Sequence, residues 1–510
     1  MTTQAIQISP ADNTATLLAD AKKGETISVR EGEKSFPLSL LDAIPFGHKA
    51  ALRGIEPGEP VMKYGEEIGR AVAPIAAGAW VHVHNIESTR GRGDLGEGGA
   101  QTPAGFYLGQ PELKGLVLEA PALDASGRTF LGYPRADGQA GTRNLVGVIS
   151  AVACANDVAV RAGGPHAAVF THQQGCSQTA PDVRMVERVL VGLGRNPNLG
   201  AVVLLSLGCE SVRSEWVADE IRKSGKRVEL IVLQKVGGLT ESVAKAKAAV
   251  ARLWAEIQAD PVPVPIEMLR VGLKCGSSDT TQGLSANLAV GKATDILVSA
   301  GARVVIGETT EFMGAEHIAA RRSANGRVAQ AIADAVSRME ARARAMGVDM
   351  RGGQPTRGNI AGGLSTIEEK SLGALAKAGS AVFQAVTEYG ELSDAPGLSL
   401  MDAPGREPEM LTGLAAAGCN LIAFATGRGA PQGFPFVPVV KVTGNARTWS
   451  LMREHMDYFA GGVMTGDSSV EEAGAELFDA LMRAASGETT AAEKSGYVNS
   501  MNIWTTGPAI

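Results

Sequence analysis

Runs of apolar, largely β-branched residues recur along most of the chain and restrict its fold more than any other feature. After Gly132 they include NLVGVISAVACA, AVVLLSLGC, RVELIVLQ, LRVGLKCG, ARVVIGE, NLIAFATG and PVVKVTGN. Amphipathic segments of helical period lie between many of them, such as APDVRMVERVLVGLG and NGRVAQAIADAVSRMEARARAMG. Continuous apolar strands that alternate with helices predict a mainly parallel sheet covered on both faces. We therefore expect a multidomain α/β fold.

The first 88 residues follow a different pattern. Short alternating runs such as ETISVR, PVMKYG and WVHVHN are interrupted by Pro-Gly and Gly signals, which predicts a small β-rich domain over residues 1–88 with one short helix near SLLDAI. Residues 89–128 are rich in Gly and polar residues and lack periodicity, as is typical of a flexible linker. The linker contains a GxGxxG pattern, but no strand precedes it and no helix begins at it, so we expect no dinucleotide site.

Pro261 and Pro263 mark the next domain boundary. They predict a stiff, extended connection after a long helix. We therefore divide the rest of the chain into a middle α/β domain, residues 129–262, and a Rossmann-like parallel-sheet domain, residues 263–510. A chain of 510 residues is too long for a single core. The last long helix is expected to begin at a capping box from Ser468 to Glu471.

Charge and cysteine usage exclude several classes of protein. The net charge is −6 and no basic run carries interleaved aromatic residues, which argues against a nucleic-acid partner. No stretch approaches about twenty uncharged apolar residues, and the N-terminus lacks the pattern of an export signal, so we expect a cytoplasmic protein with no membrane partner. The five cysteines form no CxxC pair, which predicts free thiols rather than a disulfide framework.

Reactive side chains follow nearly every predicted strand. Because ligands bind beyond the carboxyl ends of the strands in open parallel sheets, these residues predict a polar active site at one rim. Thiol, imidazole and carboxylate donors together suit iron or another transition metal better than calcium or magnesium. The alternative for each thiol is simple burial, and for His172 it is a hydrogen bond to a backbone carbonyl. The candidate metal ligands are Cys176, Cys209, Glu210, Cys275 and Glu308.

A second set of residues is suited to binding a carboxylate. Arginine side chains next to glycines offer a guanidinium fork beside backbone that a ligand can approach closely, although each arginine could instead tie loops together. A Gly-Gly pair followed by hydroxyl residues at a helix start predicts an anion site, and a simple N-cap is the alternative. The candidate substrate-binding residues are Arg135, Arg143, Asn144, Asn359, Gly362, Gly363, Thr366 and Arg428.

Two histidines in WVHVHN, His82 and His84, would share one face of a strand. They could bind a metal or transfer protons, and a solvated strand face is the alternative.

The longer motifs resemble a known family. GYPRADGQAGTRN, GCSQ, NPNLGAVVLLSLGCE, GLKCGSSD, GNIAGGLSTIEEKSLG and FATGRGAPQGFP are similar to successive motifs of the altronate/galactarate dehydratases, over about residues 130–450. The N-terminal unit is similar to the SAF, or β-clip, domain that precedes the catalytic region in that family. A related branch, the sulfolactate sulfo-lyases, expels sulfite instead of water and often carries the two parts as separate subunits.

The resemblance implies an iron-dependent hydro-lyase that acts on a sugar acid, a small hydroxy-acid substrate. Its expected cofactor is Fe²⁺, with Mn²⁺ or another divalent metal as alternatives, and its expected assembly is a homodimer formed through the middle domain. Proton removal next to a carboxylate requires a base together with stabilisation of the enediolate. The catalytic candidates are His172, His84, Lys274 and Lys370. A sulfo-lyase and a non-catalytic sugar-acid-binding protein are the alternatives, whereas a NAD-dependent oxidoreductase lacks its glycine fingerprint.

Overall fold

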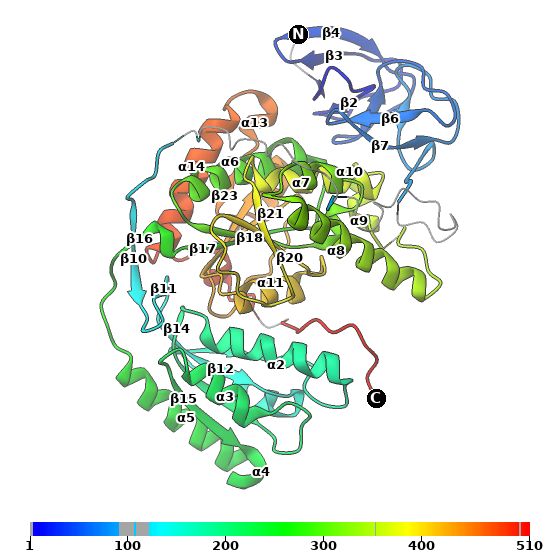
Figure 1. The fold of residues 1–510 in the computed structure, drawn as a ribbon. Helices are drawn as coiled ribbons and strands as arrows, with labels where there is room; N and C mark the ends of the chain where they lie inside the picture. Colours follow the sequence, from blue (N-terminus) through cyan, green and yellow to red (C-terminus); the bar gives the residue numbers. More distant parts are fainter. Residues whose placement is uncertain (1–3, 91–106, 109–120, 122, 352, 499–500) are drawn as a thin grey trace.

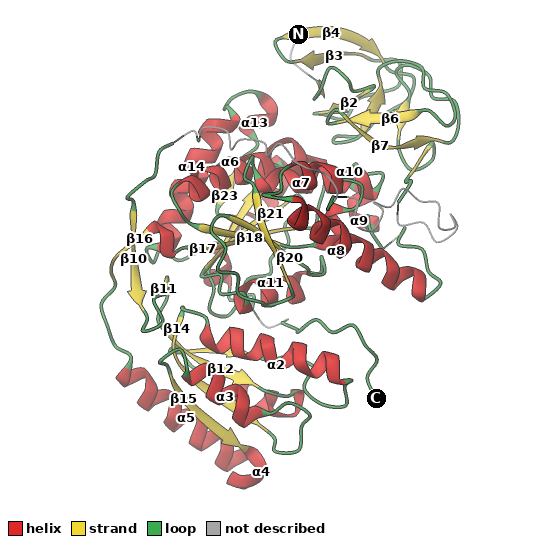
Figure 2. Cartoon of the chain, in the orientation of Figure 1, coloured by secondary structure: helices red, strands yellow, loops and turns green. Residues whose placement is uncertain are grey.

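The computed structural model describes residues 4–90, 107–108, 121, 123–351, 353–498 and 501–510 (Figure 1). The predicted linker 89–128 lies largely outside these residues, as do the glycines of its GxGxxG pattern, Gly91, Gly93 and Gly96. An N-terminal β-rich domain lies next to α10 of a central α/β domain, and a second α/β domain lies on the opposite side of it (Figures 1 and 2). The predicted multidomain α/β architecture is confirmed.

Two small sheets form the N-terminal domain. The six-stranded sheet has the order β4 (Lys34–Ser39), β3 (Thr26–Glu31), β1 (Ala5–Gln7), β2 (Thr14–Leu17), β5 (Lys49–Ala51) and β8 (Trp80–Val81). The three-stranded sheet contains β6 (Pro60–Lys63), β7 (Glu66–Ala71) and β9 (Ile86–Glu87). The helix predicted near SLLDAI is wrong, because Leu40 and Ile44 make strand-like backbone hydrogen bonds to Glu25 and Ala21 instead.

A three-stranded sheet joins the two α/β domains. Its order is β11 (Ala140–Gly141), β10 (Thr129–Pro134) and β16 (Val262–Pro265). β16 contains the proline-rich segment and lies at the edge of the sheet, where the absence of a proline N–H costs no ladder hydrogen bond.

The middle domain is a four-stranded parallel sheet between two layers of helices. Its order is β13 (Ala167–Phe170), β12 (Leu145–Ser150), β14 (Leu199–Ser206) and β15 (Arg227–Val232). Helices α1 (Asn156–Ala162) and α5 (Leu239–Glu256) share one core with the sheet. α2 (Ala180–Arg195) and α3 (Ser214–Arg222) pack in the core on the other face, and the short α4 (Leu233–Val236) follows β15.

The central domain contains seven parallel strands. Their order is β19 (Phe383–Thr387), β20 (Leu398–Met401), β18 (Arg303–Ile306), β17 (Arg270–Gly276), β21 (Leu421–Thr426), β22 (Val439–Thr443) and β23 (Tyr458–Phe459). From β17 the chain first builds one side of the sheet and then returns to build the other. The order therefore reverses between β17 and β21, which makes the carboxyl ends of these two strands the topological switch point.

Helices cover both faces of this sheet. α6 (Asn287–Ser299), α8 (Gly326–Ala345), α10 (Ile367–Leu375) and α14 (Val470–Ala485) contribute to one core, and α11 (Glu407–Ala416) contributes to the other. The shorter helices are α7 (Glu316–Arg321), α9 (Arg357–Ala361), α12 (Ala446–Leu451), α13 (Gly462–Thr465) and α15 (Ala491–Ser495). The capping box of α14 is Ser469 with Glu472, one residue later than predicted.

The two α/β domains meet where α11 packs against α2. A Cβ atom on Gly192 would lie 2.3 Å from the Ala416 carbonyl oxygen, so this approach requires glycine. Among the described residues, none of the helices has the length and apolar character needed to cross a bilayer.

Candidate active site

A cleft lies at the switch point, between the central domain and the N-terminal domain. Its volume is about 730 Å³. Asp20, Pro45 and Phe46 line it from the N-terminal domain. The central domain contributes Asp279, Ala361, Gly362, Arg428, Asn445, Ala446, Arg447 and Thr448.

Asp279 is the point at which the loops of this cleft converge. It follows β17, and its carboxylate accepts hydrogen bonds from Thr281 and from the Asn445 side chain, at 2.6 and 2.8 Å. A Cβ atom on Gly362 would lie 2.6 Å from the Cβ of Asp279, and one on Gly427 would lie 2.2 Å from its carboxylate. Three further segments of the chain, around residues 362, 427 and 445, therefore close on this one side chain.

Burial and hydrogen bonding act in opposite directions on Asp279. Burial raises its pKa, while the bonds from Thr281 and Asn445 lower it, and the net result is a pKa above the ordinary value. A carboxyl group with a raised pKa can give or take a proton nearer to neutral pH, as a general acid or base must. Arg428 is exposed beside it, and its Nη1 donates to the Gly358 carbonyl at 2.7 Å.

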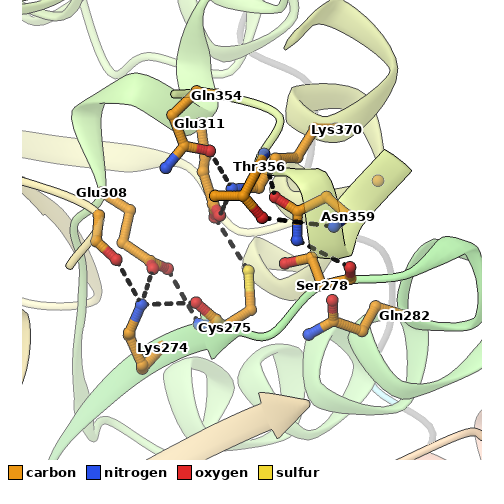
Figure 3. A network of polar contacts seen from close by, with 12 residues as sticks. Lys274, Cys275, Ser278, Gln282, Glu308, Glu311, Gln354, Thr356, Asn359 and Lys370 are labelled. Carbon is orange, nitrogen blue, oxygen red and sulfur yellow. Dashed lines mark hydrogen bonds and ion pairs between the residues drawn. The ribbon is translucent and has the colours of Figure 1, made fainter. Parts of the chain in front are cut away.

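Next to the cleft, the ends of β17 and β18 hold the buried residues Lys274, Cys275, Glu308 and Glu311 (Figure 3). Together with Lys377, from the 3₁₀ helix Ala376–Ala378, they form a thiol–carboxylate cluster. The Cys275 thiol lies 2.9 Å from Glu311 Oε2 and 3.0 Å from Lys377 Nζ. Lys377 also donates to Glu308 and Glu311, at 2.9 and 2.8 Å, and Lys274 donates to Glu308.

Glu308 adopts an unusual backbone conformation in this cluster. Its φ is +64°, in the left-handed region that non-glycine residues rarely adopt. In this conformation its carboxylate accepts from the Cys275 N–H at 2.9 Å as well as from both lysines. Such strain typically persists at functional sites, where surrounding contacts hold it in place.

The charges of the cluster balance one another. Burial raises the pKa of Cys275 well above its ordinary value, so the thiol is protonated. Burial also raises the pKa of Glu311, but the three lysines 377, 370 and 274 outweigh burial and hold it well below its ordinary value. Burial lowers the pKa of Lys274 and Lys377, but the nearby acidic groups more than offset it, so both remain ammonium groups.

The cluster does not fit a metal ion, although sequence analysis expected Cys275 and Glu308 as ligands. The donor types suit a transition metal, and those of Cys275, Glu308 and Glu311 lie within 4.8 Å of one another. Each of them, however, already contacts a buried ammonium group. A dication would lie beside two uncompensated positive charges in a medium that screens them poorly.

A polar shell links the cluster to the loops of the cleft (Figure 3). Lys370 lies 3.4 Å from Glu311 and donates to the Gln354 side chain. The Asn359 amide donates to the Ser278 carbonyl at 2.9 Å and accepts from the Thr356 N–H at 2.9 Å, which caps α9. Asn359 thus ties α9 to the loop that carries Asp279.

The N-terminal domain docks here through buried charges. Lys49 and Lys63 both contact Glu369 of α10 at 2.8 Å, and Lys49 also donates to Gly363 O and Ser365 Oγ at 3.0 and 2.8 Å. Burial raises the pKa of Glu369, but the two lysines lower it by more than burial raises it, to about 2. The pKa of Lys49 is lowered to about 8, mainly by burial. Glu369 raises this pKa and Lys63 lowers it, and neither outweighs burial.

The histidines of WVHVHN do not share a strand face, so that prediction is wrong. β8 ends at Val81, and the Asn85 side chain closes a turn by accepting from the His82 N–H and donating to the Trp80 carbonyl, both at 2.9 Å. His82 is buried against Ser365, and its pKa of about 3 reflects burial first and then the charge of Lys49. His84 is exposed beside Trp80.

His172 lies buried in the middle domain with both ring nitrogens in use. Its Nε2 contacts the Ser150 carbonyl at 2.8 Å, and its Nδ1 accepts from the Gln174 N–H at 3.0 Å. Burial lowers its pKa to about 4. These contacts match the structural alternative, a histidine that donates to a backbone carbonyl.

Three of the expected substrate-binding residues lie in contacts that tie the chain together. Arg135 donates to the carbonyls of residues 197 and 143, and the Asn144 amide donates to that of residue 257. Arg143 pairs with Glu493 at 2.7 Å and donates to backbone carbonyls of the central domain. Arg135 and Asn144 therefore hold segments of the middle domain together, and Arg143 joins that domain to the central domain.

Two of the other expected substrate-binding residues line the cleft, whereas Gly363 and Thr366 do not. Gly362 and Arg428 line it directly. Gly363, with φ of +95°, packs against Gly47, where a Cβ atom would lie 2.2 Å from the Gly47 carbonyl oxygen. Thr366 is the N-cap of α10 and accepts from the Glu369 N–H at 3.2 Å, as the N-cap alternative proposed.

Cys176, Cys209 and Glu210 belong to the middle domain and do not join the Cys275 cluster. Both thiols are exposed. Glu210 accepts hydrogen bonds from the hydroxyl groups of Ser206 and Ser214 and from the Gly208 N–H, so its carboxylate closes its own loop.

Several residues of the site were given no role by sequence analysis. Asp279, Glu311 and Asn445 belong to the reactive residues that follow predicted strands, and the sequence pointed to the rim where they lie without assigning them a function. Lys49, Lys63, Glu369 and Lys377 gave no such signal, because none of them follows a strand of the central sheet.

The sequence matches one family along almost its whole length. Residues 3–89 match the altronate/galactarate dehydratase SAF domain. Residues 132–258 match the second domain of D-galactarate dehydratase/altronate hydrolase, and residues 266–509 match the C-terminal domain of D-galactarate/altronate dehydratase.

Individual relatives agree with this match. The chain is 33% identical to altronate dehydratase of Bacillus subtilis over 511 residues, which covers 96% of this chain and 97% of the relative. It is 31% identical to altronate dehydratase of Escherichia coli, over 97% of each chain. It is 39% identical to the beta subunit of (2R)-sulfolactate sulfo-lyase of Chromohalobacter salexigens over 386 residues, 74% of this chain and 97% of that subunit.

Proposed function

Because the chain belongs to the D-galactarate/altronate dehydratase family of hydro-lyases, we propose that it dehydrates a sugar acid, an altronate-type aldonate or a galactarate-type aldarate, to a 2-keto-3-deoxy acid. The observation that supports this most directly is the cleft at the switch point, where Arg428, Asp279 and Asn445 converge from the carboxyl ends of different strands. Iron dependence and assembly as a cytoplasmic homodimer are parts of the same proposal.

The carboxylate of the substrate binds to Arg428 in this proposal. A guanidinium group offers two parallel donors that match a carboxylate. The adjacent Gly427 and Gly429 let Asp279 and Met452 pack closely against the loop that carries Arg428. Arg447 lines the same cleft and provides a second cation. Asn445 and Thr448 can contact substrate hydroxyl groups.

Asp279 carries the proton transfer. Dehydration removes the proton next to the carboxylate, expels the hydroxyl group from the neighbouring carbon as water, and leaves an enol that becomes the 2-keto acid. A carboxyl group with a raised pKa is suited to take the first proton or to protonate the departing hydroxyl. The thiol–carboxylate cluster fixes the end of β17 and so positions the Asp279 loop.

A sulfo-lyase that releases sulfite and pyruvate from sulfolactate is the second candidate. The identity to the sulfo-lyase beta subunit, 39%, exceeds that to either altronate dehydratase. The chain is also 42% identical to a sulfo-lyase alpha subunit over 62 residues. Both reactions start from the same proton abstraction next to a carboxylate, and they differ only in the leaving group.

An anaerobic incubation with ferrous iron tests the proposal. The purified protein is given altronate, galactarate or 3-sulfolactate, and both 2-keto acid and sulfite are measured. Keto acid from a sugar acid without sulfite supports the dehydratase, whereas sulfite from sulfolactate supports the second candidate. Binding of an acid without any keto acid would overturn both and indicate a binding protein.

A further inference from the structure

Three exposed thiols lie at the carboxyl edge of the middle-domain sheet. Cys154 follows β12, Cys176 follows β13 and Cys209 follows β14, and these strands are neighbours in the order β13, β12, β14. The other two cysteines of the chain, Cys275 and Cys419, are buried. Free cysteine is among the most buried residue types, so three exposed thiols at one sheet edge indicate a role other than packing.

The loop that carries Cys176 contacts both of the other cysteine loops. The Gln174 carbonyl accepts from the N–H of Ala153, next to Cys154, at 3.0 Å. The Gly175 carbonyl accepts from the N–H of Ser211, two residues after Cys209, at 3.0 Å. Each of the three cysteines therefore lies within two residues of one of these two backbone hydrogen bonds, so the three loops lie side by side.

The backbone around Cys176 is held in a strained form. Gly175 has φ of +109°, and a Cβ atom there would lie 2.6 Å from the Ala151 carbonyl oxygen, at the end of β12. Ser177, a non-glycine residue, has φ of +54°. Left-handed backbone at the non-glycine Ser177, directly after an exposed thiol, costs energy and typically persists where a site needs it.

Cys209 is also held in place and has a donor at its sulfur. The Glu210 carboxylate fixes the loop by accepting from the Gly208 N–H at 2.6 Å and from the Ser214 hydroxyl at 2.5 Å. The Gln234 amide donates to Cys209 Sγ at 3.4 Å. N–H donors to sulfur are one of the means by which proteins tune iron–sulfur centres.

We propose that Cys154, Cys176 and Cys209 bind an iron–sulfur cluster that has one iron without a protein ligand. Thiolate ligands without imidazole or carboxylate select such clusters. Among the described residues, the three thiols do not meet within the 4.8 Å that gathers the ligands of a single ion, whereas a cluster spans a wider gap. Three thiolates would leave one iron of the cluster open to an oxygen ligand such as a hydroxyl group.

This inference rests on the proposed function for the need for iron, and it names the middle-domain residues that would hold it. Its test does not rest on that function, because it measures metal and sulfide rather than turnover. If the cluster forms but no acid is dehydrated, the proposed function fails and the site stands. If dehydration occurs without a cluster, the proposed function stands and the cluster site fails.

The experiment is anaerobic reconstitution of the full chain with ferrous iron and sulfide. We expect iron and acid-labile sulfide in equal amounts per chain, with a broad visible absorption band. Cys154→Ser, Cys176→Ser and Cys209→Ser should each lose most of the sulfide, while Cys419→Ala and Cys275→Ala keep it. Circular dichroism verifies that each variant is folded.

A second measurement needs no variant. Alkylation of the wild-type chain before and after reconstitution, read by mass spectrometry, should show protection of Cys154, Cys176 and Cys209 together. Iron without sulfide, a single zinc ion, unprotected thiols, or sulfide that survives in the three serine variants would each overturn the inference.

Discussion

Lys49 and Glu369 form a buried ion pair of 2.8 Å that joins the N-terminal domain to helix α10. Lys63 contacts the same carboxylate at the same distance, so one anion holds two cations across the domain interface. Removing one partner of such a group leaves charge buried and uncompensated, which is more costly than the pair itself is favourable.

Glu369→Gln should therefore weaken docking of the N-terminal domain. We expect a loss of about 3–5 kcal/mol in the free energy of unfolding, measured by urea denaturation. Glu59→Gln breaks an exposed pair with Arg53 and serves as the control, with an expected effect much smaller than that of Glu369→Gln. Equal losses in the free energy of unfolding for the two substitutions would contradict a larger contribution from the buried ion pair.

Lys49 should give the stability a distinct pH dependence. Its pKa is lowered by burial from 10.5 to about 8, so between these values the unfolded chain binds a proton that the folded chain does not. The free energy of unfolding due to this group then rises with pH, by up to about 1.4 kcal/mol per pH unit in that window. Urea denaturation at pH 7.5 and 9.5 should show a larger rise for wild type than for Lys49→Met, and parallel curves would refute this.

Asp279→Asn should lower kcat about 10²–10⁴-fold with little change in KM, because the amide keeps the shape of the side chain but cannot transfer the proton. Asp295→Asn is the matched control, since Asp295 is also buried with a pKa raised by burial but does not line the cleft. The measurement is kcat and KM for both variants with the acid that the wild-type protein turns over. An unchanged kcat in Asp279→Asn would remove Asp279 from the mechanism.

Arg428→Gln should act mainly on binding. Loss of a charge-assisted pair with the substrate carboxylate costs about 1.5–3 kcal/mol, so KM should rise about ten- to a hundredfold. Arg406→Gln is the control, because Arg406 pairs with Glu409 and does not line the cleft. An unchanged KM in Arg428→Gln would place the carboxylate elsewhere.

The N-terminal domain should work as a separate chain. Its docking rests on contacts such as those of Lys49 with Glu369 and of Arg90 with Glu316 and Glu340, rather than on covalent linkage. Co-expression of residues 1–90 with residues 121–510 should give a stable complex with activity, detected by co-purification and turnover. Glu369→Gln in the larger chain should weaken the complex, and failure of the wild-type parts to associate would show that the link is essential.

Strand-end reasoning from the sequence located much of the site. Lys274, Cys275 and Glu308 lie together because β17 and β18 are adjacent parallel strands whose carboxyl ends share an edge. Asn359 and Gly362 were predicted for another reason, a Gly-Gly pair before a helix start, and Gly362 lines the cleft. The alternation of apolar runs and helices was likewise sufficient for the fold class, because burial on both faces dictates that pattern.

Other parts of the site could not be predicted from sequence. Lys377 reaches Cys275 from the short 3₁₀ helix Ala376–Ala378, which has no strand-end signal. Lys49 and Glu369 are 320 residues apart and meet only because two domains dock. Arg143 and Arg428 have similar glycine-rich settings, and only the tertiary structure shows that one pairs with Glu493 while the other lines the cleft.

Consecutive residues of α10 serve different neighbours: Glu369 receives the lysines of the N-terminal domain, and Lys370 contacts Glu311 of the buried cluster. A helix turns as a rigid unit, so the two contacts cannot shift independently. Any tilt of the N-terminal domain that widens the cleft for an incoming acid would therefore also move Lys370. Motion at the mouth of the cleft is in this way coupled to motion in the buried cluster.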